Sequence, residues 1–287
     1  MKLSELGKDW FRAYEYCVRH YKTREAAAIA KHYRPQKLYK YYSFESMYWE
    51  ENTFKSEFAF NLPENFNDPL DSRWFLDYET ILRERFRDIG EDWSTSLIGD
   101  DSSFQSMIQL YEEDLMPLRN MFCLCCFSKT PSSNLMWGHY ANKHTGFCLE
   151  YDVSRFPKEC QVVLPVIYTE EPFDASMILD MRGIEDKYAA LSPLLFKSKD
   201  WSYEKEWRAI ISNDGGTIPI IKSVPGAISG VYLGLNAYGD NRNKLEEWAD
   251  NNGIPAYQME RSYLSFDLIF ELTSDIKANR SSKGFIV

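Results

Sequence analysis

An unbroken apolar run, Phe-Cys-Leu-Cys-Cys-Phe at residues 122–127, limits the folds open to this chain because its composition is that of a buried strand. Cys123 and Cys126 form a C-x-x-C spacing inside the run. A zinc knuckle would need a polar, glycine-containing turn and a second pair of ligands at regular spacing, and the sequence offers neither. The six cysteines are even in number. However, no apolar signal stretch follows Met1, so we expect reduced core thiols rather than disulfides.

Composition excludes several classes of protein. The chain has 287 residues, of which 44% are hydrophobic and 26% charged, as in ordinary globular proteins. Its formal net charge of −10 opposes non-specific binding to duplex DNA, which requires a surplus of cations. No stretch approaches the roughly 20 apolar residues of a membrane span. We therefore expect a cytoplasmic protein with no membrane partner.

The order of the expected elements favours an α+β fold over a doubly wound parallel sheet, because strands and helices do not alternate regularly. We predict a central mixed or antiparallel sheet with flanking helices, preceded by an N-terminal helix. Residues 1–36 are expected to form a helical extension, and residues 37–287 a single domain. Strands are expected at 37–44, at the start of 56–72, at 121–128, 145–152, 161–168, 206–211, 217–221 and 228–235, around Tyr257 and at 268–272. Residues 213–216 are expected to turn the strand at 206–211 into the strand at 217–221, as in a hairpin. Helices are expected at 4–32, 70–120, 133–142, 174–192 and 240–252.

A first polar cluster spans residues 65–71 and contains Asn67, Asp68 and Asp71 around Pro69. The proline fixes its own φ and pushes Asp68 towards an extended conformation. One interpretation is a capped strand-to-helix corner, with Asp68 or Asp71 as the helix N-cap. The other is a corner that presents Asn67 and Asp68 to the hydroxyl groups of a ligand.

A second cluster follows the cysteine-rich strand, which delivers Ser128 at its end and leads to a short aromatic helix with Trp137, His139 and Tyr140. Aromatic rings beside a polar strand end suit a flat, cationic nicotinamide ring. The alternative is that Trp137 and Tyr140 simply belong to the core. His139 and His144 are five residues apart, which does not place them on one helical face for a zinc pair.

The third cluster contains Glu204, Glu206 and Arg208. On a strand these alternate residues share one face, where two carboxylates repel unless a cation or a ligand separates them. Arg208 continues that face and is expected to pair with Glu206. Either the three residues form a surface ladder of ion pairs, or one carboxylate is catalytic and its neighbours position it.

In their order along the chain these motifs resemble a large uncharacterised bacterial and phage-associated family, a domain of unknown function. The resemblance covers about residues 37–272 and leaves the N-terminal helix as an addition. It is carried by the segments Leu-Tyr-Lys-Tyr at 38–41, Phe-Asn-Asp-Pro at 66–69, Cys-Phe-Ser at 126–128, Met-Trp-Gly-His-Tyr-Ala at 136–141 with His144 and Gly-Phe at 146–147, and Trp-Ser-Tyr-Glu-Lys-Glu-Trp-Arg at 201–208.

The layout is also similar to that of ADP-ribosyltransferases, which implies an ADP-ribosyltransferase-like fold that consumes NAD as substrate. In this resemblance Tyr140 or Trp137 stacks the nicotinamide, and Lys40, at a position where Arg or His is usual, holds the ribose with Ser128. Glu206 bonds the ribose 2′-hydroxyl, and Glu204 orients or deprotonates the acceptor. The implied catalytic residues are Glu206, Glu204, Tyr140 and His139, and the implied NAD-binding residues are Lys40, Tyr41, Asn67, Asp68, Ser128, Trp137 and Arg208, with no metal.

Such an enzyme would act as a toxin or an anti-phage defence effector on a macromolecular acceptor, either protein or nucleic acid, and would have an antitoxin or defence-system partner. Two alternatives are open. One is a metal-dependent hydrolase or nuclease that uses Asp68, Asp71, His139, His144 and Glu206. The other is a non-catalytic sensor or adaptor domain of a defence system, in which the polar clusters serve structure.

Overall fold

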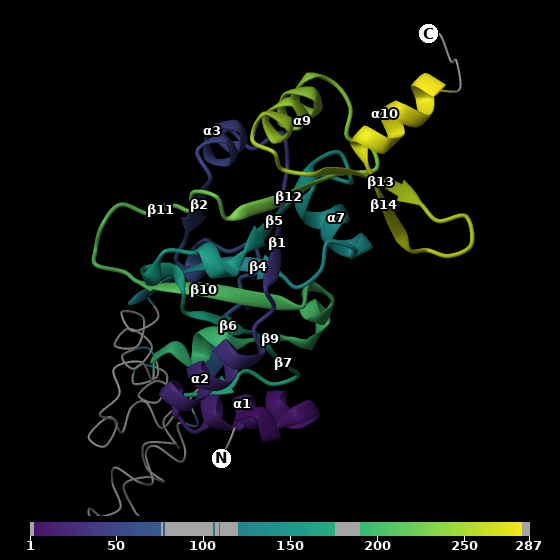
Figure 1. Cartoon of the computed structure of the whole chain (residues 1–287). Coiled ribbons are helices and arrows are strands. Elements are labelled where there is room, and N and C mark those ends of the chain that lie inside the picture. Colours follow the sequence, from purple (N-terminus) through teal and green to yellow (C-terminus); the bar gives the residue numbers. More distant parts are fainter. Residues whose placement is uncertain are drawn as a thin grey trace, which may run out of the picture.

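A computed structural model describes residues 3–75, 77, 106, 109, 120–175 and 190–282 (Figure 1). The helices expected at 70–120 and 174–192 fall mostly outside these residues. No helix in the described part of the chain is both long and apolar enough to cross a membrane.

An eight-stranded sheet forms the centre of the molecule, with the strand order β14-β13-β12-β5-β1-β4-β10-β6. Strands β12 and β13 run parallel, whereas the other neighbouring strands run antiparallel. With helices flanking this sheet, the expected mixed α+β architecture is confirmed (Figure 1). The strands are β1 (Lys37–Tyr42), β4 (Phe122–Ser128), β5 (Phe147–Asp152), β6 (Val163–Pro165), β10 (Glu206–Ser212), β12 (Ile228–Leu233), β13 (Ala256–Arg261) and β14 (Leu268–Leu272).

Short strand pairs and helices surround the sheet. The pairs are β2 (Glu57–Phe60) with β11 (Ile220–Ser223), β3 (Trp74–Phe75) with β8 (Phe173–Asp174), and β7 (Ile167–Thr169) with β9 (Phe196–Ser198). The α-helices are α1 (Trp10–Arg19), α2 (Thr23–Tyr33), α3 (Trp49–Phe54), α7 (Asn134–Tyr140), α9 (Asp240–Asn251) and α10 (Thr273–Ser282). The 3-10 helices of the described residues are η1 (Leu3–Glu5), η2 (Gly7–Asp9), η3 (Pro63–Asn65), η4 (Val153–Arg155), η5 (Lys158–Cys160), η8 (Pro193–Leu195) and η9 (Lys199–Glu204).

Helices α1 and α2 lie at the β6 end of the sheet, at the foot of Figure 1. The single helix expected over 4–32 is wrong, because Tyr21 adopts a positive φ of 55° between the two helices. The hydroxyl of Tyr14 donates to the carbonyl oxygen of Pro165 at 2.9 Å. The rings of Trp10 and Trp207 stack with their centroids 6.4 Å apart. The N-terminal helices thus pack on the same core as the sheet.

Alternation along the central strands produces two apolar layers, as the pleat requires. Phe147 and Leu149 of β5 enter the main core, whereas Cys148 between them joins a smaller cluster that contains Trp137 and Tyr232. The apolar run at 122–127 forms β4 in the middle of the sheet, with β1 on one side and β10 on the other. Its prediction as a buried strand is confirmed.

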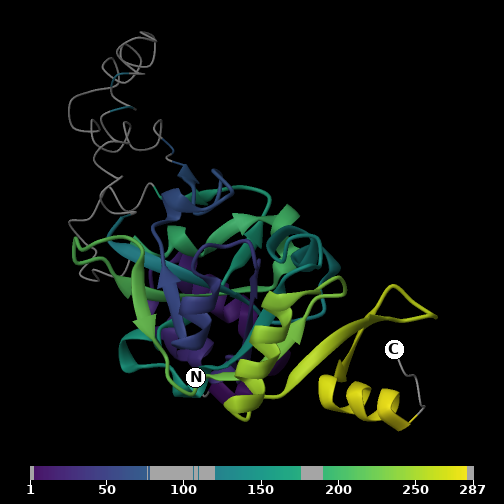
Figure 2. The same cartoon turned by 90° about the horizontal axis from the view of Figure 1, so that it is seen from above.

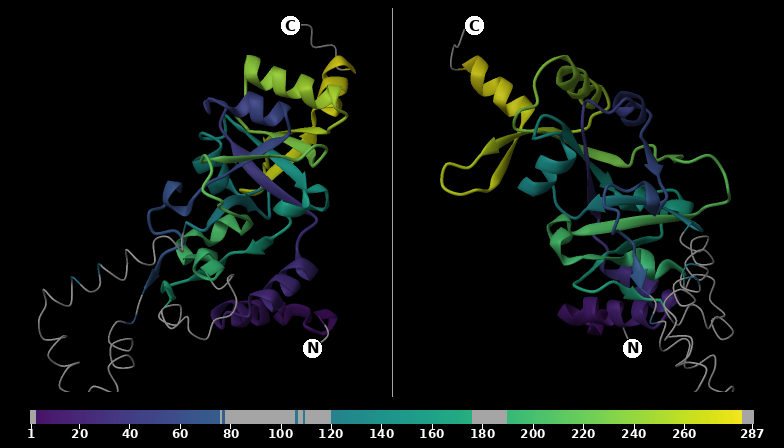
Figure 3. Two further views of the ribbon diagram at one scale, coloured as in Figure 1. Left: turned by 90° about the vertical axis from the view of Figure 1, so that its left-hand side faces the viewer. Right: turned by 180° about the vertical axis from the view of Figure 1, so that it is seen from behind.

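The hairpin expected after β10 is wrong. Residues 213–216 were expected to turn the chain into a strand that would pair with β10, but β11 pairs with β2 instead. The physical reason is that both edges of β10 are already hydrogen-bonded, one to β4 and the other to β6. At the opposite end of the sheet, β13 and β14 form a hairpin that projects with α10 from the body of the molecule (Figures 2 and 3).

Candidate active site

Side chains from all three polar clusters meet around Lys197, a buried residue of β9. Its ammonium nitrogen lies 2.6 Å from Oε2 of Glu204 and 3.1 Å from Oε2 of Glu206. A third carboxylate oxygen, Oδ2 of Asp71, lies 3.2 Å away. One buried cation therefore holds three carboxylates, two from the segment just after it in the sequence and one, Asp71, from a distant part of the chain.

The inner side of this cluster is sealed by Arg208, which is fully buried in β10. Its Nη2 donates to both carboxylate oxygens of Asp71 at 2.8 Å, and its Nε donates to Oε1 of Glu206 at 2.8 Å. Its Nη1 donates to the hydroxyl of Ser72 at 2.8 Å and to the carbonyl oxygen of Leu194 at 2.6 Å. The expected pairing of Arg208 with Glu206 is confirmed, and the guanidinium has no donor left for a ligand.

Glu204 reaches Lys197 from a different element than expected. It ends the 3-10 helix η9, and Lys205, with a φ of 47°, turns the chain before β10 begins at Glu206. The expectation that the two glutamates share one strand is therefore wrong. Ser128 fixes this turn, because its buried hydroxyl donates to the backbone oxygen of Glu204 at 2.7 Å.

The second carboxylate oxygen of Glu204 is held by Tyr140, the last residue of α7. The tyrosine hydroxyl donates to Oε1 of Glu204 at 2.6 Å. The side-chain nitrogen of Asn67 lies 3.5 Å from the same hydroxyl oxygen. Helix α7 begins at a defined point because the Ser133 hydroxyl accepts from the backbone N–H of Met136, and this cap fixes where Tyr140 lies.

Glu204 and Tyr140 face a cavity of about 260 Å³. It opens between β1, β4, the loop after η3 and the start of β10. Polar and aromatic side chains dominate its wall. The lining includes Tyr39, Lys40, Tyr41, Asn61, Asn65, Phe66, Asn67, Asp71, Cys126, Ser128, Met136, Tyr140, Lys197, Glu204 and Glu206.

The two glutamates titrate in opposite directions. Burial and the neighbouring Glu206 carboxylate raise the pKa of Glu204, and Lys197 offsets only part of this, so that the pKa is about 6. Burial also acts to raise the pKa of Glu206, but the charges of Arg208 and Lys197 outweigh it and hold this pKa well below its usual range. Glu206 is thus ionised at neutral pH, whereas Glu204 takes up a proton as pH falls through about 6.

Lys197 stays protonated. Burial acts to lower its pKa, but the opposing charges of Glu206 and Asp71 outweigh this effect and raise the pKa above its ordinary value. With all five side chains ionised, three carboxylates face two cations, Lys197 and Arg208. The excess negative charge explains why one carboxylate of the group, Glu204, has a raised pKa.

Several residues assigned from the sequence lie elsewhere. Trp137 is fully buried, donates from its ring nitrogen to the carbonyl oxygen of Pro131 at 2.6 Å and packs edge-on against Tyr41. Tyr41 donates its hydroxyl to the carbonyl oxygen of Thr130 at 2.8 Å. The ring of Trp137 therefore serves packing outside the cavity, whereas Tyr41 lines the cavity wall.

Asp68 and His139 also lie apart from the carboxylate cluster. Asp68 accepts the backbone N–H of Leu70 at 2.9 Å within a turn. The expected helix N-cap is wrong, because residues 69–72 form turns that lead into strand β3 and no helix begins there. His139 is exposed, with its ring 6.1 Å from the ring of Tyr203, and does not line the cavity. Lys40 does line the cavity, and its ammonium donates to the carbonyl oxygen of Cys126 at 3.1 Å.

No motif in the sequence predicts a role for Lys197, and Asp71 is predicted only as a cap or a metal ligand. A signal was available, because Lys197 directly follows the apolar run Leu-Leu-Phe at 194–196. A lone cation at the end of such a run is expected to be buried and therefore paired. Tyr168 was missed as well, and its hydroxyl accepts the backbone N–H of Glu206 at 2.8 Å.

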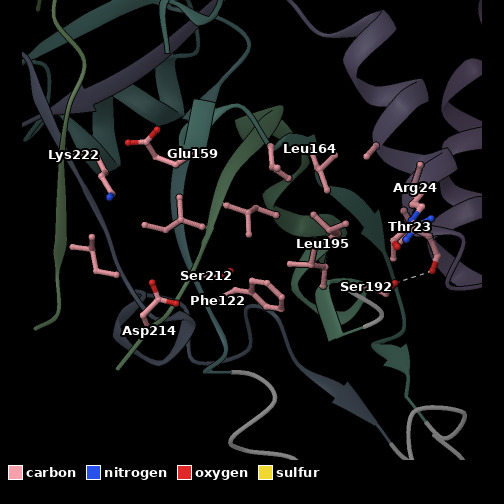
Figure 4. Close-up of a pocket in the computed structure, with 18 of the residues that line it drawn as sticks. Thr23, Arg24, Phe122, Glu159, Leu164, Ser192, Leu195, Ser212, Asp214 and Lys222 are labelled. Atoms are coloured by element: carbon pink, nitrogen blue, oxygen red, sulfur yellow. Dashed lines mark hydrogen bonds between the residues drawn. The ribbon is translucent and has the colours of Figure 1, made fainter. Parts of the chain in front are cut away.

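A second, larger cavity of about 680 Å³ lies between α2, β6 and β10 (Figure 4). Aliphatic side chains such as Leu164, Leu195 and Ile210 form most of its wall, with Arg24 towards one end and Lys222 towards the other (Figure 4). Neither Lys197 nor Glu204 lines it. This cavity offers apolar volume but none of the buried acid–base groups that surround Lys197.

Residues 136–209 match the model of a protein family described as "Protein of unknown function (DUF2971)". The matched segment contains Tyr140, Lys197, Glu204, Glu206 and Arg208. It begins near the middle of α7 and ends within β10, so the chain is similar to this family over much of the site. No curated protein and no solved structure matches the chain.

Proposed function

We propose that the cavity beside Lys197 binds the nicotinamide of NAD and the ribose attached to it. The protein then cleaves the bond between nicotinamide and ribose, as an ADP-ribosyltransferase does. The observation that carries this proposal is the Glu204 carboxylate, which faces the cavity between an ammonium and a tyrosine hydroxyl. A carboxylate held in this way stabilises positive charge that develops on a sugar, and it accepts a proton from an attacking hydroxyl group.

The reaction breaks the bond between ribose C1′ and the nicotinamide nitrogen. The bonding electron pair leaves with nicotinamide, and a hydroxyl oxygen of the acceptor or of water attacks C1′. The proton of that hydroxyl passes to Glu204, whose pKa of about 6 leaves it ionised at neutral pH and ready to accept a proton. Glu206 and Arg208 do not touch the substrate in this scheme but keep Lys197 and Asp71 in place.

The size of the cavity agrees with a partial fit of the dinucleotide. Its volume of about 260 Å³ lies just under the roughly 300–1,000 Å³ typical of small-molecule pockets. Nicotinamide and its ribose therefore enter, with the half-buried ring of Tyr140 as the stacking surface and Lys40 and Asn67 near the sugar. The adenosine diphosphate part lies outside the cavity.

The carboxylate cluster favours this proposal over the metal-dependent hydrolase. One oxygen each of Asp71, Glu204 and Glu206 already contacts Lys197, so its ammonium takes the central position that a divalent cation would need. No group of three or more His, Cys, Asp or Glu side chains within the described residues is arranged to hold a metal ion. Activity should accordingly survive chelation.

The resemblance to the phage-associated family supports a role as a toxin or a defence effector that modifies a macromolecule. The acceptor, a protein or a nucleic acid, would approach from the open side of the cavity at Asn67 and Tyr140. An antitoxin or defence partner that covers this opening would block both NAD and the acceptor.

Release of nicotinamide from NAD by the purified full-length chain, in the presence of EDTA, tests the proposal. We expect release by the wild type and a loss of at least about a hundredfold in Glu204→Gln, as for removal of a general base. Glu246→Gln is the matched control, because Glu246 is also buried and ion-paired, with Arg242 at 2.7 Å, but lies outside the cavity.

Equal release by wild type and Glu204→Gln would contradict the assignment of Glu204. Absence of release by the wild type, together with no change in its melting temperature on addition of NAD, would contradict the NAD site itself and favour the adaptor alternative. Release that requires a divalent cation would favour the metal-dependent hydrolase.

A further inference from the structure

The two ends of the eight-stranded sheet are protected differently. At one end, β6 has three residues, includes Pro165 and is covered by α1 through the hydroxyl of Tyr14. At the other end, β14 has five residues of sequence Leu-Ile-Phe-Glu-Leu, with no proline and no lysine. Short length, proline, lysine and covering elements are the usual protection of an edge strand, and among the residues that the structure describes none of these protects the free edge of β14.

The hairpin that carries β14 also exposes a patch of apolar side chains. Tyr263, Leu264 and Phe266 at its tip are 100%, 98% and 97% exposed, and Ile269 of β14 is 44% exposed. The tip projects from the body of the molecule (Figures 2 and 3). Isolated exposed apolar residues are ordinary, but a run of them beside an unprotected sheet edge marks an interaction surface.

The register of the hairpin fixes which peptide groups of β14 face outward. The backbone N–H of Ser262 donates to the carbonyl oxygen of Asp267 at 3.2 Å, so this pair is hydrogen-bonded across the hairpin. Antiparallel pairing alternates, and therefore the next residues to bond β13 are Ile269 and Glu271. The peptide groups of Leu268, Phe270 and Leu272 point away from β13.

We propose that this edge is a self-association surface, on which β14 pairs antiparallel with β14 of a second copy of this chain. A two-fold axis at Phe270 places Leu268 opposite Leu272 of the second copy. In this register all three outward-facing residues of each strand find a partner, and the two sheets become continuous.

Charge and shape favour the same register. With the axis at Phe270, Ile269 lies opposite Glu271 of the second copy, so no two like charges meet. A shift of the axis by one residue, to Glu271, would oppose the two Glu271 carboxylates and leave Leu268 unpaired. In the favoured register the apolar tip lies beside the first turn of α10 of the second copy, where Ile276 is half-buried.

Sedimentation velocity of the full-length chain over a range of protein concentrations tests this proposal. We expect a reversible dimer whose dissociation constant rises roughly tenfold or more in Ile269→Glu, because two pairs of like charges then face each other. Adding Glu271→Lys in the same chain should restore the wild-type dissociation constant, since the glutamate introduced at position 269 of each copy would then face a lysine of the other.

Ile269→Lys is the matched control, because its added charge faces Glu271 of the second copy, and it should remain a dimer. Ile269 is exposed but lies opposite Glu260 of β13, so far-UV circular dichroism and the melting temperature of each variant must verify that the hairpin is kept. A wild type that remains monomeric at every concentration would overturn the proposal. So would a dimer that Ile269→Glu does not weaken, or one that the second substitution does not restore.

Discussion

The two sides of the cluster around Lys197 contain similar residues but differ in what surrounds them. On the inner side, Arg208 holds the carboxylates of Asp71 and Glu206 in a fully paired group, although both of these residues also line the cavity. On the outer side, Glu204 and Tyr140 share one short hydrogen bond and face the cavity. The two glutamates differ in pKa because of the charges around them and not because of their exposure. Glu204 is 3% exposed and Glu206 is 4% exposed.

The protonation state of a buried carboxylate therefore depends on the charged groups around it as well as on its burial. Glu206 is stabilised in its ionised form by two cations and so cannot exchange a proton near neutral pH. Glu204 receives less compensation and has a pKa of about 6. We therefore expect substitutions on the inner side to affect stability, and substitutions on the outer side to affect activity.

Arg208→Met is expected to have the largest effect. It leaves Asp71 and Glu206 buried without their main cation, and removal of one member of a buried ion pair costs about 3–5 kcal/mol. Urea unfolding measures this cost. Arg242→Met is the control, since the pair of Arg242 with Glu246 lies nearer the surface. Similar losses in the two variants would contradict the special role of the inner side.

Glu206→Gln is expected to lower the free energy of unfolding by roughly 2–4 kcal/mol at neutral pH, because a carboxamide cannot satisfy both Arg208 and Lys197. The pKa of Glu206 is lowered in the folded state. Its contribution is therefore present above the pKa of an unfolded glutamate, about 4.3, and is lost as pH falls below that value. The difference in free energy of unfolding between wild type and variant should therefore become smaller in acid. A difference that becomes larger in acid would contradict the lowered pKa of Glu206.

Tyr140→Phe is expected to have a smaller effect on stability, about 1 kcal/mol, from the loss of one hydrogen bond. Its signature is the pH dependence of nicotinamide release. The rate should rise with pH through about 6 in the wild type, as Glu204 loses its proton. The Tyr140 hydrogen bond lowers the pKa of Glu204, so the midpoint should move to higher pH in the variant. An unchanged midpoint would contradict this coupling.

Local patterns allowed much of the fold to be predicted. The apolar run became β4, the aromatic segment after Ser133 became α7, and the charged segment at 206–211 became β10. Alternation along β10 also predicted that Arg208 would reach Glu206. These features depend on neighbouring residues, which the sequence shows directly.

The remaining features depend on contacts between distant residues. Lys197, Asp71 and Tyr140 meet only because β9, the corner after η3 and α7 are brought together by the sheet. The left-handed turn at Lys205 has no glycine to reveal it. Residues 217–221 could have paired with β10 only if one edge of β10 were free, but β4 and β6 occupy both edges.

The decisive experiment compares nicotinamide release by Glu204→Gln and Glu206→Gln, each expressed per folded molecule. We expect the free energy of unfolding of Glu204→Gln to lie within about 1 kcal/mol of the wild type, since its carboxamide keeps the shape and a neutral form is tolerated there. We expect the same variant to lose at least about a hundredfold of nicotinamide release. Glu206→Gln is expected to be less stable but to retain measurable release. Release by Glu204→Gln, with none by folded Glu206→Gln, would contradict the account and exchange the roles of the two carboxylates.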